Sequence, residues 1–450
     1  MRKHCFLALL LLFAAAAQSF GANFYLRKGA TGSNSGTDWT NAWTEFNSIN
    51  WGSVSCGDTI WIAGGTYTSS LSVNMTCTSG TVLNINRVQA TDAVPAAAAG
   101  WNSSFDSQVI LNNASISLAG GAYYTINGRV NYGIQVVCTS SGGCNGVTGA
   151  TSGSIDHVSL YHVELYGPAC VMAQNCGGGG ASGLNVAPSS NKVTNLLFSR
   201  GFIHRWGELV RTSNWTNCTI EYSSLSDTHN DGPQHEDVMY NYPSTNMTLR
   251  YNKIWGSPND GIFFEFGGAT NFKFYGNIYY HSGGSLMTFK VGDSYGPVFI
   301  YNNIFENDGT FGDYQPGWLN FGGTMDPSSE IANNIFENVD NQASPSFSNH
   351  NAYNLGGYTE PLTLKYTSGT QFVNTSSANP PAADFHLTAA GATSFAGKGK
   401  ALAAEYNQDM DGHTRGADGG WDIGAYEYGG TSTPPPTPPA PPTNLTGVVQ

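Results

Sequence analysis

The sequence contains little charge, and positive charge is the scarcer kind. Only 11% of its 450 residues are Asp, Glu, Lys or Arg, and 31 acidic residues stand against 18 Lys and Arg, for a formal net charge of -13. Proteins that bind nucleic acid neutralise backbone phosphates with clustered Lys and Arg. The composition therefore argues against nucleic acid as a partner, and a polyanionic ligand would need an added cation.

Long apolar runs are missing outside the N-terminus. Residues 1–22 have the pattern of a secretory signal peptide, in which Arg2 and Lys3 precede an apolar run over 6–17 and small residues mark the cleavage site. No other stretch approaches the ~20 apolar residues that span a bilayer. We therefore predict an exported protein, secreted or at the cell surface, with no transmembrane segment.

Cysteine is also sparse, with eight in the chain, and Cys5 lies in the predicted signal peptide. The others suit an oxidising compartment, where disulfides form. Two cysteine pairs share the same spacing within Gly-rich loops and are expected to form local disulfides, Cys138–Cys144 and Cys170–Cys176. Cys56 and Cys77 could form a third disulfide. Cys218, left over, lies two residues before Ile220 on a predicted strand, so we expect a buried apolar thiol.

Glycine and aromatic residues are plentiful instead. The chain has 56 Gly, 23 Tyr and 23 Phe, and 40% of its residues are hydrophobic. Strands and turns favour this composition, whereas coiled coils and helical repeats are rich in Ala, Glu, Lys and Leu. The hydrophobic content argues against global disorder. The sequence thus predicts an all-β fold, in one elongated domain or two compact ones.

A repeat with units of uneven length runs through the middle of the chain. Each unit has an apolar anchor, a turn residue three positions later and another apolar residue two positions after that. The anchors and turn residues are Phe198/Gly201, Ile220/Ser223, Leu249/Asn252, Phe274/Asn277, Ile300/Asn303 and Ile331/Asn334. Such units bury their apolar face only by stacking. We predict a single-stranded right-handed parallel β-helix, with Asn252, Asn277 and Asn303 stacked at one bend.

Both ends of the predicted solenoid resemble a known group. Residues 24–39 (FYLRKGATGSNSGTDW) and 57–67 (GDTIWIAGGTY), and at the far end 384–387 (DFHL), 409–412 (DMDG) and 421–428 (WDIGAYEY), resemble secreted bacterial right-handed β-helix proteins of the pectate-lyase-like superfamily. The resemblance covers about residues 24–428. It implies the fold and export, but not one reaction, because this group contains lyases, hydrolases and epimerases.

The resemblance and the composition together divide the chain. We expect one β-helix domain over 23–428, with an N-terminal cap and a C-terminal closing segment at 384–428. Residues 429–442 form a Pro-rich linker. Residues 443–450 resemble the start of a fibronectin type III module, so an accessory module is expected beyond the linker. The protein is expected to be a monomer.

Polar functional groups concentrate in residues 227–237 (DTHNDGPQHED). Asp231 and Asp260 lie at the same offset beyond their anchors, Ile220 and Leu249. Equal offsets predict that the two aspartates stack about 5 Å apart on adjacent coils. Three further charged residues share a second, larger offset beyond their anchors: Glu236, Glu265 and Lys290. Three apolar residues nearby are expected to point inward: Ile262, Phe264 and Phe266.

Carboxylates this close recruit a cation or shift a pKa. We predict a calcium site whose ligands are Asp231, Asp260 and Glu265. Calcium would hold the carboxylate of a uronate sugar and make its C5 proton acidic, and Lys290 would remove that proton. With Arg211 from the preceding coil, these residues predict a polysaccharide lyase acting on an acidic glycan.

A second interpretation is a glycoside hydrolase that uses Asp231 and Asp260 as general acid and base. The layout of 230–232, 259–262 and 282–286 resembles the acidic and histidine motifs of polygalacturonases. It departs from them because Asn259 replaces an expected carboxylate and the expected His is missing from the third stretch.

A third interpretation is a non-catalytic glycan-binding or adhesion module that uses the same groove. The residues expected to contact the glycan in any of these cases are Glu236, His235, His229 and Trp255. The His-x-Asp pairs that begin at His229 and His235 are also competent transition-metal ligands. Asn-Asp-Gly is, in addition, a common bend sequence, so its repetition is also explained by repeated turns.

Overall fold

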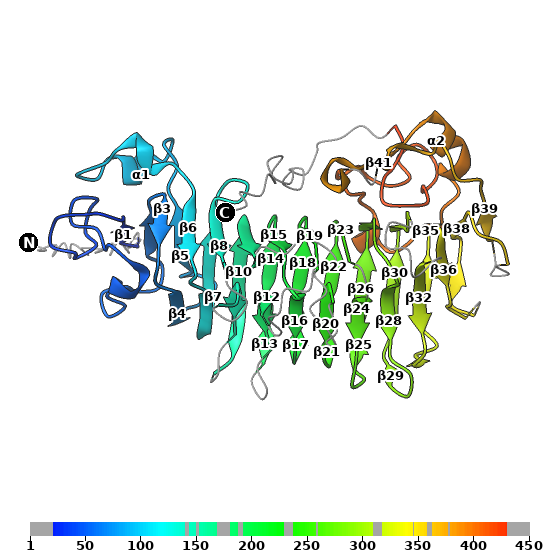
Figure 1. The fold of residues 1–450 in the computed structure, drawn as a ribbon, viewed down its shortest axis with the longest axis horizontal. Helices are drawn as coiled ribbons and strands as arrows, with labels where there is room; N and C mark the ends of the chain where they lie inside the picture. The colour runs from blue at the N-terminus through cyan, green and yellow to red at the C-terminus, as the bar shows by residue number, and fades with distance from the viewer. Residues whose placement is uncertain are drawn as a thin grey trace, which may run out of the picture.

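The protein is an elongated stack of coils built from parallel strands (Figure 1). The computed structural model describes residues 21–139, 144–149, 153–168, 181–187, 192–228, 237–257, 260–308, 317–344, 346–357, 362–376 and 379–429, with Asp260 described by its backbone. Residues 1–20 of the predicted signal peptide, the Pro-rich linker beyond 429, the fibronectin-like residues and the Cys170–Cys176 pair lie outside these residues. Among the described residues, one sheet has 25 strands and a second has 12.

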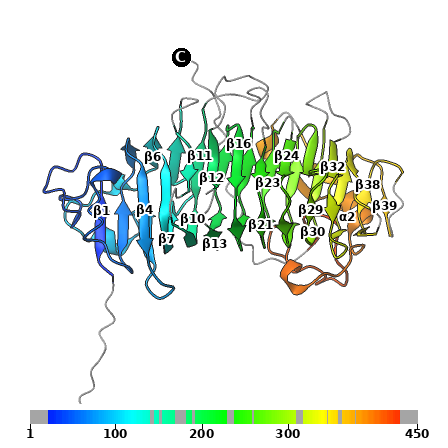
Figure 2. The ribbon, with the colours of Figure 1, turned by 90° about the horizontal axis from the view of Figure 1, so that it is seen from below.

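Strands of successive coils pair in columns that run along the stack (Figure 2). Column A carries the site described below. Its strands are β4 (Leu71–Thr76), the first half of β7 (Ile116–Asn127), β9 (Val147–Thr148), β12 (Ser182–Val186), β16 (Glu208–Thr212), β20 (Met239–Asn241), β24 (Asp260–Phe264), β28 (Ser285–Phe289), β32 (Gly317–Phe321) and β36 (Val339–Asn341).

Columns B and C belong to the same sheet as column A. Column B is short and contains β13 (Val193–Thr194), β17 (Trp215–Thr216), β21 (Ser244–Thr245) and β25 (Ala269–Thr270). Column C contains β1 (Asn23–Leu26), β2 (Thr59–Ile62), β5 (Leu83–Arg87), the second half of β7, β10 (Ile155–Tyr161), β14 (Leu197–Ser199), β18 (Thr219–Glu221), β22 (Thr248–Arg250), β26 (Phe272–Tyr275), β30 (Val298–Tyr301), β34 (Glu330–Ala332) and β37 (Ser348–Asn349).

Column D is the second sheet. It contains β3 (Gly65–Tyr67), β6 (Val109–Asn112), β8 (Ile134–Val137), β11 (Val163–Tyr166), β15 (Phe202–His204), β19 (Ser224–Ser226), β23 (Lys253–Trp255), β27 (Ile278–Tyr280), β31 (Ile304–Glu306), β35 (Ile335–Glu337), β38 (Ala352–Tyr353) and β39 (Leu364–Lys365). Two smaller pairs are β29 (Ser294–Tyr295) with β33 (Thr324–Met325), and β40 (Phe372–Asn374) with β41 (Asp384–Leu387).

Helices are few and short. The α-helices are α1 (Ala93–Ala96) and α2 (Ala389–Phe395), and single 3-10 turns occur at Phe46–Ser48, Ser103–Phe105, Pro380–Ala382 and Ala404–Tyr406. Within the described ranges, no helix combines the length and the apolar character that crossing a bilayer requires.

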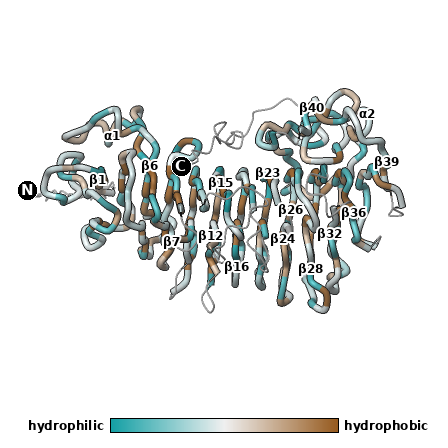
Figure 3. The backbone as a smooth tube through the Cα atoms, viewed as in Figure 1, coloured by the Kyte–Doolittle hydropathy of each residue, from teal (hydrophilic) through white to brown (hydrophobic). Residues whose placement is uncertain are grey.

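The predicted repeat anchors are register partners in column C. Phe198 pairs with Ile220, Ile220 with Leu249, and the remaining anchors continue in order through Phe274, Ile300 and Ile331. Their side chains are at most 1% exposed, and apolar residues recur along the strands of every column (Figure 3). Burial of each such side chain contributes about 1.5–3 kcal/mol to the stability of the folded protein. Because each coil is buried only by its neighbours, the stack is stable and a single coil is not.

The predicted asparagine stack is present at the bend between columns C and D. The backbone N–H of Asn252 donates to Oδ1 of Asn277 at 2.9 Å, and that of Asn277 donates to Oδ1 of Asn303 at 2.8 Å. The same bond continues to Asn334 and Asn351. Each buried side chain therefore satisfies a backbone donor of the preceding coil, which is how a tight bend is repeated without orphaned polar groups.

The closing segment folds back along the side of the solenoid. It packs over tyrosines on the outer face of column C, where the ring of Tyr406 meets those of Tyr275 and Tyr301 at 4.8 and 4.9 Å. Farther along, the hydroxyl of Tyr251 donates to the carbonyl of Gln408. The segment thus covers a lateral face of several coils.

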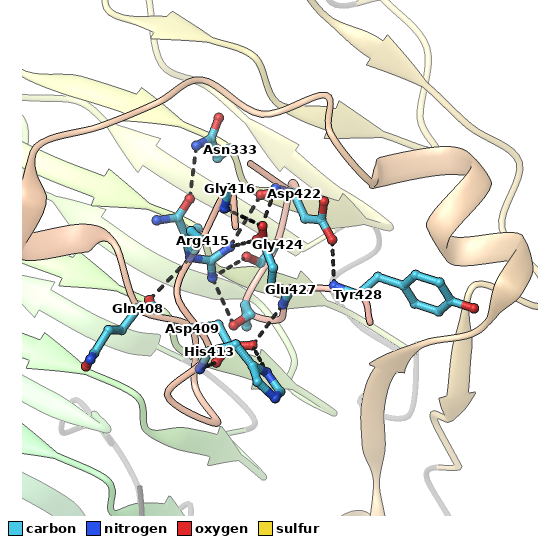
Figure 4. A network of polar contacts seen from close by, with 12 residues as sticks. Asn333, Gln408, Asp409, His413, Arg415, Gly416, Asp422, Gly424, Glu427 and Tyr428 are labelled. Carbon is cyan, nitrogen blue, oxygen red and sulfur yellow. Dashed lines mark hydrogen bonds and ion pairs between the residues drawn. The ribbon is translucent and has the colours of Figure 1, made fainter. Parts of the chain in front are cut away.

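Buried polar contacts hold the closing segment together (Figure 4). The fully buried Arg415 donates to the carbonyls of Gly424 and Ala425 at 2.9 and 3.0 Å and pairs with Glu427 at 3.5 Å. Asp409 accepts from the backbone N–H groups of Asp411, His413 and Glu427. Asp409 therefore shapes a turn here.

Two disulfides close the expected loops. Cys56 bonds to Cys77 and Cys138 bonds to Cys144, both as predicted. Cys218 is a free thiol with no exposed surface, and burial raises its pKa to about 12. The expected apolar role of Cys218 is therefore confirmed.

Candidate functional site

Glu265 and Lys290 stack on adjacent coils, as their equal offsets predict. Phe264 pairs with Phe289 in register, so the following residues, Glu265 and Lys290, are neighbours across the two coils. The ammonium group of Lys290 forms an ion pair with one carboxylate oxygen of Glu265, and the hydroxyl of Tyr240 donates to the other. Glu265 thus joins three coils of column A through one carboxylate.

Asp231 lies outside the described residues, so its predicted stacking on Asp260 stays a prediction, but the register of the neighbouring strands does not follow the offsets from the anchors. Met239 pairs with Ile262, and continuing that register two residues back places Asp237 beside Asp260. The stretch from the anchor Ile220 to Met239 is longer than the stretch from the anchor Leu249 to Ile262, because the loop before Met239 is longer. Counting from the anchors ignored that difference.

The same correction applies to Glu236. Asn241 pairs with Phe264, so the residue next to Glu265 on the preceding coil is Tyr242. His229, Asp231, His235 and Glu236 lie outside the described residues. Their predicted roles in metal or substrate binding therefore stay predictions.

Phe266 faces solvent, although we expected it to point inward with Ile262 and Phe264. The latter two are buried as predicted, but Phe266 is 60% exposed. Its φ of 61° lies in the left-handed region, which breaks the strand alternation just after β24. The exposed ring stacks on Tyr242 at 5.3 Å with an angle of 3° between the planes.

Arg211 lies on the outward side of β16, two coils before Glu265. It is in register with Tyr240, and its guanidinium lies over the rings of Tyr240 and Tyr242 at 5.4 and 5.8 Å. Arg211 also donates to the Tyr242 hydroxyl at 3.3 Å and pairs with Glu208 at 3.4 Å. The predicted cation is therefore half-exposed and oriented by aromatic rings.

These residues form a continuous outward surface over β16, β20, β24 and β28. We call it the Arg211–Lys290 strip, and it consists of Arg211, Tyr240, Tyr242, Phe263, Glu265, Phe266 and Lys290. Its rings form two parallel pairs, Tyr240 on Phe263 at 5.9 Å and Tyr242 on Phe266, and the two tyrosines meet edge to face at 5.0 Å and 83°. Lys290 lies over the ring of Phe266 at 5.5 Å. The strip thus combines aromatic faces with two cations.

Electrostatics keep the polar groups of the strip in defined protonation states. Burial and the hydrogen bond to Glu265 raise the pKa of Tyr240, so its hydroxyl remains a donor at neutral pH. For Arg211, burial disfavours the cation, but Glu208 and Tyr242 outweigh burial and raise its pKa. Arg211 therefore stays charged, and Glu208 balances its charge.

The predicted calcium site of Asp231, Asp260 and Glu265 does not fit the backbone. Asp260 begins β24 and Glu265 follows its last residue, so their Cα atoms are about 16 Å apart at about 3.3 Å per residue. Calcium takes oxygen ligands at about 2.4 Å, so one ion cannot bind both carboxylates. The described side chains include no group of three or more His, Cys, Asp or Glu placed to hold a metal. Calcium binding by Asp231 and Asp260 alone remains a prediction.

Trp255 is buried in column D, whereas the strip lies on column A. It is 2% exposed and stacks between Phe202 and Tyr280 at 5.8 Å from each. A ring in this position stabilises the contact between coils and has almost no surface for a sugar. We therefore withdraw Trp255 from the predicted substrate contacts.

A second polar cluster lies at the end of column D. Nδ1 of His281 is 2.6 Å from Oδ2 of Asp308, and the backbone N–H of His281 donates to Glu306 at 3.1 Å. Burial raises the pKa of Glu306 to about 8, against the hydrogen bond from His281, and the neighbouring Asp308 and Glu337 raise it further. The sequence carried a signal for this pair, because Glu306 and Glu337 lie at equal offsets beyond the anchors Ile300 and Ile331 and are register partners.

No family model and no curated protein sequence matches the chain. Among solved structures, the chain is similar to the pectate lyase Pel9A at 12% identity and a TM-score of 0.56, with 91% of this chain and 97% of the other covered. It is less similar to a rhamnogalacturonan lyase (12% identity, TM-score 0.43, coverage 83% and 98%) and to a lacto-N-biosidase from Eubacterium ramulus (10% identity, TM-score 0.38, coverage 74% and 68%). At these identities the likeness concerns the fold, and the chain has the pectate-lyase-like parallel β-helix fold.

Proposed function

We propose that the protein is an exported enzyme that cleaves an acidic, uronate-containing polysaccharide by β-elimination. The observation that carries the proposal is the Arg211–Lys290 strip, in which two cations flank a group of aromatic side chains across four adjacent coils and the ring of Phe266 is exposed. The likeness in fold to a pectate lyase supports the same substrate class.

The strip has the dimensions and chemistry to bind an acidic glycan. Adjacent coils are about 4.8 Å apart, so Arg211 and Lys290 are separated by about 14 Å along the stack, which is longer than one sugar unit. The exposed ring of Phe266 offers a flat apolar face to the C–H groups of a sugar. Arg211 and Lys290 are the partners for its carboxylates, because charge-assisted hydrogen bonds to carboxylate are strong.

In β-elimination, a base takes the proton from C5, a double bond forms between C4 and C5, and the C4–O bond breaks. The leaving oxygen then takes a proton. Cations at the sugar carboxylate make the C5 proton more acidic. We assign that neutralising role to Lys290, together with Arg211, in place of the base role expected from sequence. The reason is that the ammonium group of Lys290 forms an ion pair with the Glu265 carboxylate.

The two roles of Lys290 predict different pH profiles. A neutralising Lys290 acts while protonated, so turnover falls when the lysine loses its proton. A basic Lys290 acts while neutral, so turnover rises with pH over the same range. The pH dependence of kcat therefore distinguishes the roles.

Lys290→Met tests the proposal, with Lys28→Met as the matched control. Lys28 forms a similar ion pair with Glu45, and the lysine side chains are 47% and 44% exposed, but the Lys28 pair lies far from the strip. We expect Lys290→Met to melt like the parent and to lose at least tenfold in turnover, whereas Lys28→Met stays active. Equal activity of both variants would remove Lys290 from the site.

A substrate panel identifies the reaction class. Pectic, alginate and neutral polysaccharides are incubated with the protein, with and without calcium, and both ultraviolet absorbance and reducing ends are measured. New absorbance with new ends supports the lyase. New ends alone support the hydrolase, for which the register of Asp237 beside Asp260 is the favouring observation. Binding without either product indicates a non-catalytic glycan-binding module.

Export is part of the same proposal. The described disulfides Cys56–Cys77 and Cys138–Cys144 are of the kind that persist in oxidising compartments. Fractionation of cells that produce the full chain should place the processed protein outside the cytoplasm. Full-length, active protein in the cytoplasmic fraction would contradict export.

A further inference from the structure

A cavity of about 380 Å³ lies between the outer face of column C and the closing segment. Its floor comes from Lys273, Phe299 and Glu330, and its wall comes from residues 400–406. Small-molecule sites in proteins have volumes of about 300–1,000 Å³, so this cavity is in the range for a small ligand. It lies on column C, whereas the Arg211–Lys290 strip lies on column A.

The floor places an aromatic ring between a donor and an acceptor. Lys273 pairs with Phe299 in register, and Phe299 pairs with Glu330, so the three residues occupy three adjacent coils. The two charged residues are therefore about 10 Å apart, at about 4.8 Å per coil, with the ring midway. Phe299 is only partly buried, so its ring is available to a ligand.

The charges of the cavity are balanced. Lys273 Nζ lies 2.6 Å from Glu405 Oε2, and Lys400 forms an ion pair with Glu330. Burial alone would raise the pKa of Glu330, but hydrogen bonds from Lys400, Asn349 and Tyr301 lower it, so its carboxylate is charged at neutral pH. Two cations and two anions leave no net charge to attract an acidic ligand.

Hydrogen-bonding capacity remains on this surface. An ammonium group has three donors, and one hydrogen bond to Glu405 is recorded for Lys273. The Glu405 side chain is 49% exposed, so its carboxylate can accept further bonds. A ligand suited to this site has an apolar face for Phe299 and neighbouring hydroxyls that donate to carboxylates and accept from ammonium groups.

We propose that this cavity binds a neutral sugar unit, stacked on Phe299 and hydrogen-bonded to Lys273 and Glu405. A neutral pyranose has C–H groups on its faces and hydroxyls around its edge, which match the ring and the flanking charged groups. A uronate would meet Glu330 and Glu405 as well as the lysines, so the carboxylate gives it no advantage. The inference does not rest on the proposed reaction at the Arg211–Lys290 strip.

Galactose and galacturonate test the proposal, because the two sugars differ only at C6, where galacturonate has a carboxylate and galactose does not. Binding to the full chain is measured by titration calorimetry, together with a panel of other neutral hexoses and pentoses. We expect saturable binding of at least one neutral sugar, and at least tenfold weaker binding to Phe299→Ala. Tyr428→Ala, which removes an exposed ring that belongs neither to the strip nor to the cavity lining, should bind the neutral sugar like the parent.

A second variant covers the case in which Phe299→Ala fails to fold. Lys273→Met keeps the aromatic floor and removes the donor, and it should also weaken the neutral sugar at least tenfold. Absence of saturable binding by every neutral sugar overturns the proposal. Equal weakening in Tyr428→Ala overturns it as well, and so does Phe299-dependent binding that is tighter for galacturonate than for the neutral sugar.

Ligand binding should also protect the closing segment, because the sugar would contact both the floor and the wall of the cavity. A ligand that binds the docked form stabilises it by mass action. Proteolysis of the closing segment should therefore slow in saturating neutral sugar in the parent but not in Phe299→Ala. Sugar-independent cleavage rates in the parent would contradict binding at this cavity.

Discussion

Lys290 follows Glu265 by one coil, and its ammonium group contacts the Glu265 carboxylate that Tyr240 also contacts from the preceding coil. One acidic side chain therefore sets the orientation of a cation and of a phenol on the same outward surface. Removing the acid and removing the cation should have opposite effects on the charge of that surface.

Glu265→Gln should strengthen binding of uronate oligosaccharides. The change removes a negative charge next to Lys290, while the amide oxygen can still accept from Tyr240. The effect on Kd should be largest at low ionic strength, because salt screens exposed charges. Dissociation constants at low and high salt measure it, with Glu45→Gln, from the distant Lys28 pair, as control. Loss of calcium-dependent binding in Glu265→Gln would instead restore Glu265 as a calcium ligand.

Asn277→Ala should destabilise the solenoid by about 1–3 kcal/mol, because it leaves the buried N–H of Asn252 without its acceptor. Asn74 in β4 is exposed and its backbone is not left-handed. Asn74→Ala should therefore change the free energy of unfolding by less than about 0.5 kcal/mol. Urea unfolding of both variants measures the difference. Equal losses would mean that burial of the amide is not what matters.

Glu306 should make the protein less stable as pH rises from about 4.5 to about 8. Over this window the folded state keeps a proton on Glu306, whose pKa is raised from 4.5 to about 8 by burial, and the unfolded state does not. Stability falls with pH wherever the folded state binds more protons. Glu306→Gln should remove this contribution and be the more stable protein at pH 8. Urea unfolding at pH 5 and pH 8 tests this, and an unchanged pH slope would show that Glu306 is charged in the folded state.

His386 should fasten the closing segment below about pH 9. Its pKa is raised from 6.5 to about 9, chiefly by the hydrogen bond to Asp411, against the opposing effect of burial, and Asp384 raises it further. The stabilisation is complete below the unfolded value of 6.5 and is lost as pH rises through 9. Hydrogen exchange over residues 384–428 should speed up between pH 7 and 10 beyond the intrinsic rate. Asp411→Asn should weaken this extra pH dependence, and identical profiles would refute the role.

The repeat anchors were predictable because the local pattern of anchor, turn residue and second apolar residue does not depend on the length of the loops. Each anchor follows a short bend from the preceding strand, so Phe198 through Ile331 align in register whatever the length of the loop elsewhere in the coil. Lys290 and Glu265 were also placed correctly, since the interval from Leu249 to Phe274 equals the interval from Ile262 to Met287. Counting residues from the anchors therefore predicts neighbours correctly where successive coils have equal lengths.

The rest of the site was not predictable by counting. The loop before Met239 is longer than the loop before Ile262, so Asp231 and Glu236 were assigned to columns that Asp237 and Tyr242 occupy. Phe266 was misplaced because its left-handed φ cannot be read from an alternating pattern. Residue positions that depend on loop length or on a single backbone angle can thus be assigned only from the structure.

The lateral position of the closing segment has a consequence for synthesis. A chain emerges from the ribosome with its N-terminus first, and its coils can stack as they appear. Tyr251, Tyr275 and Tyr301 are then in place long before Tyr406 and Gln408 arrive to cover them. Throughout that interval the nascent protein carries an uncovered aromatic face, so the last part of the domain to be translated also shields it from aggregation.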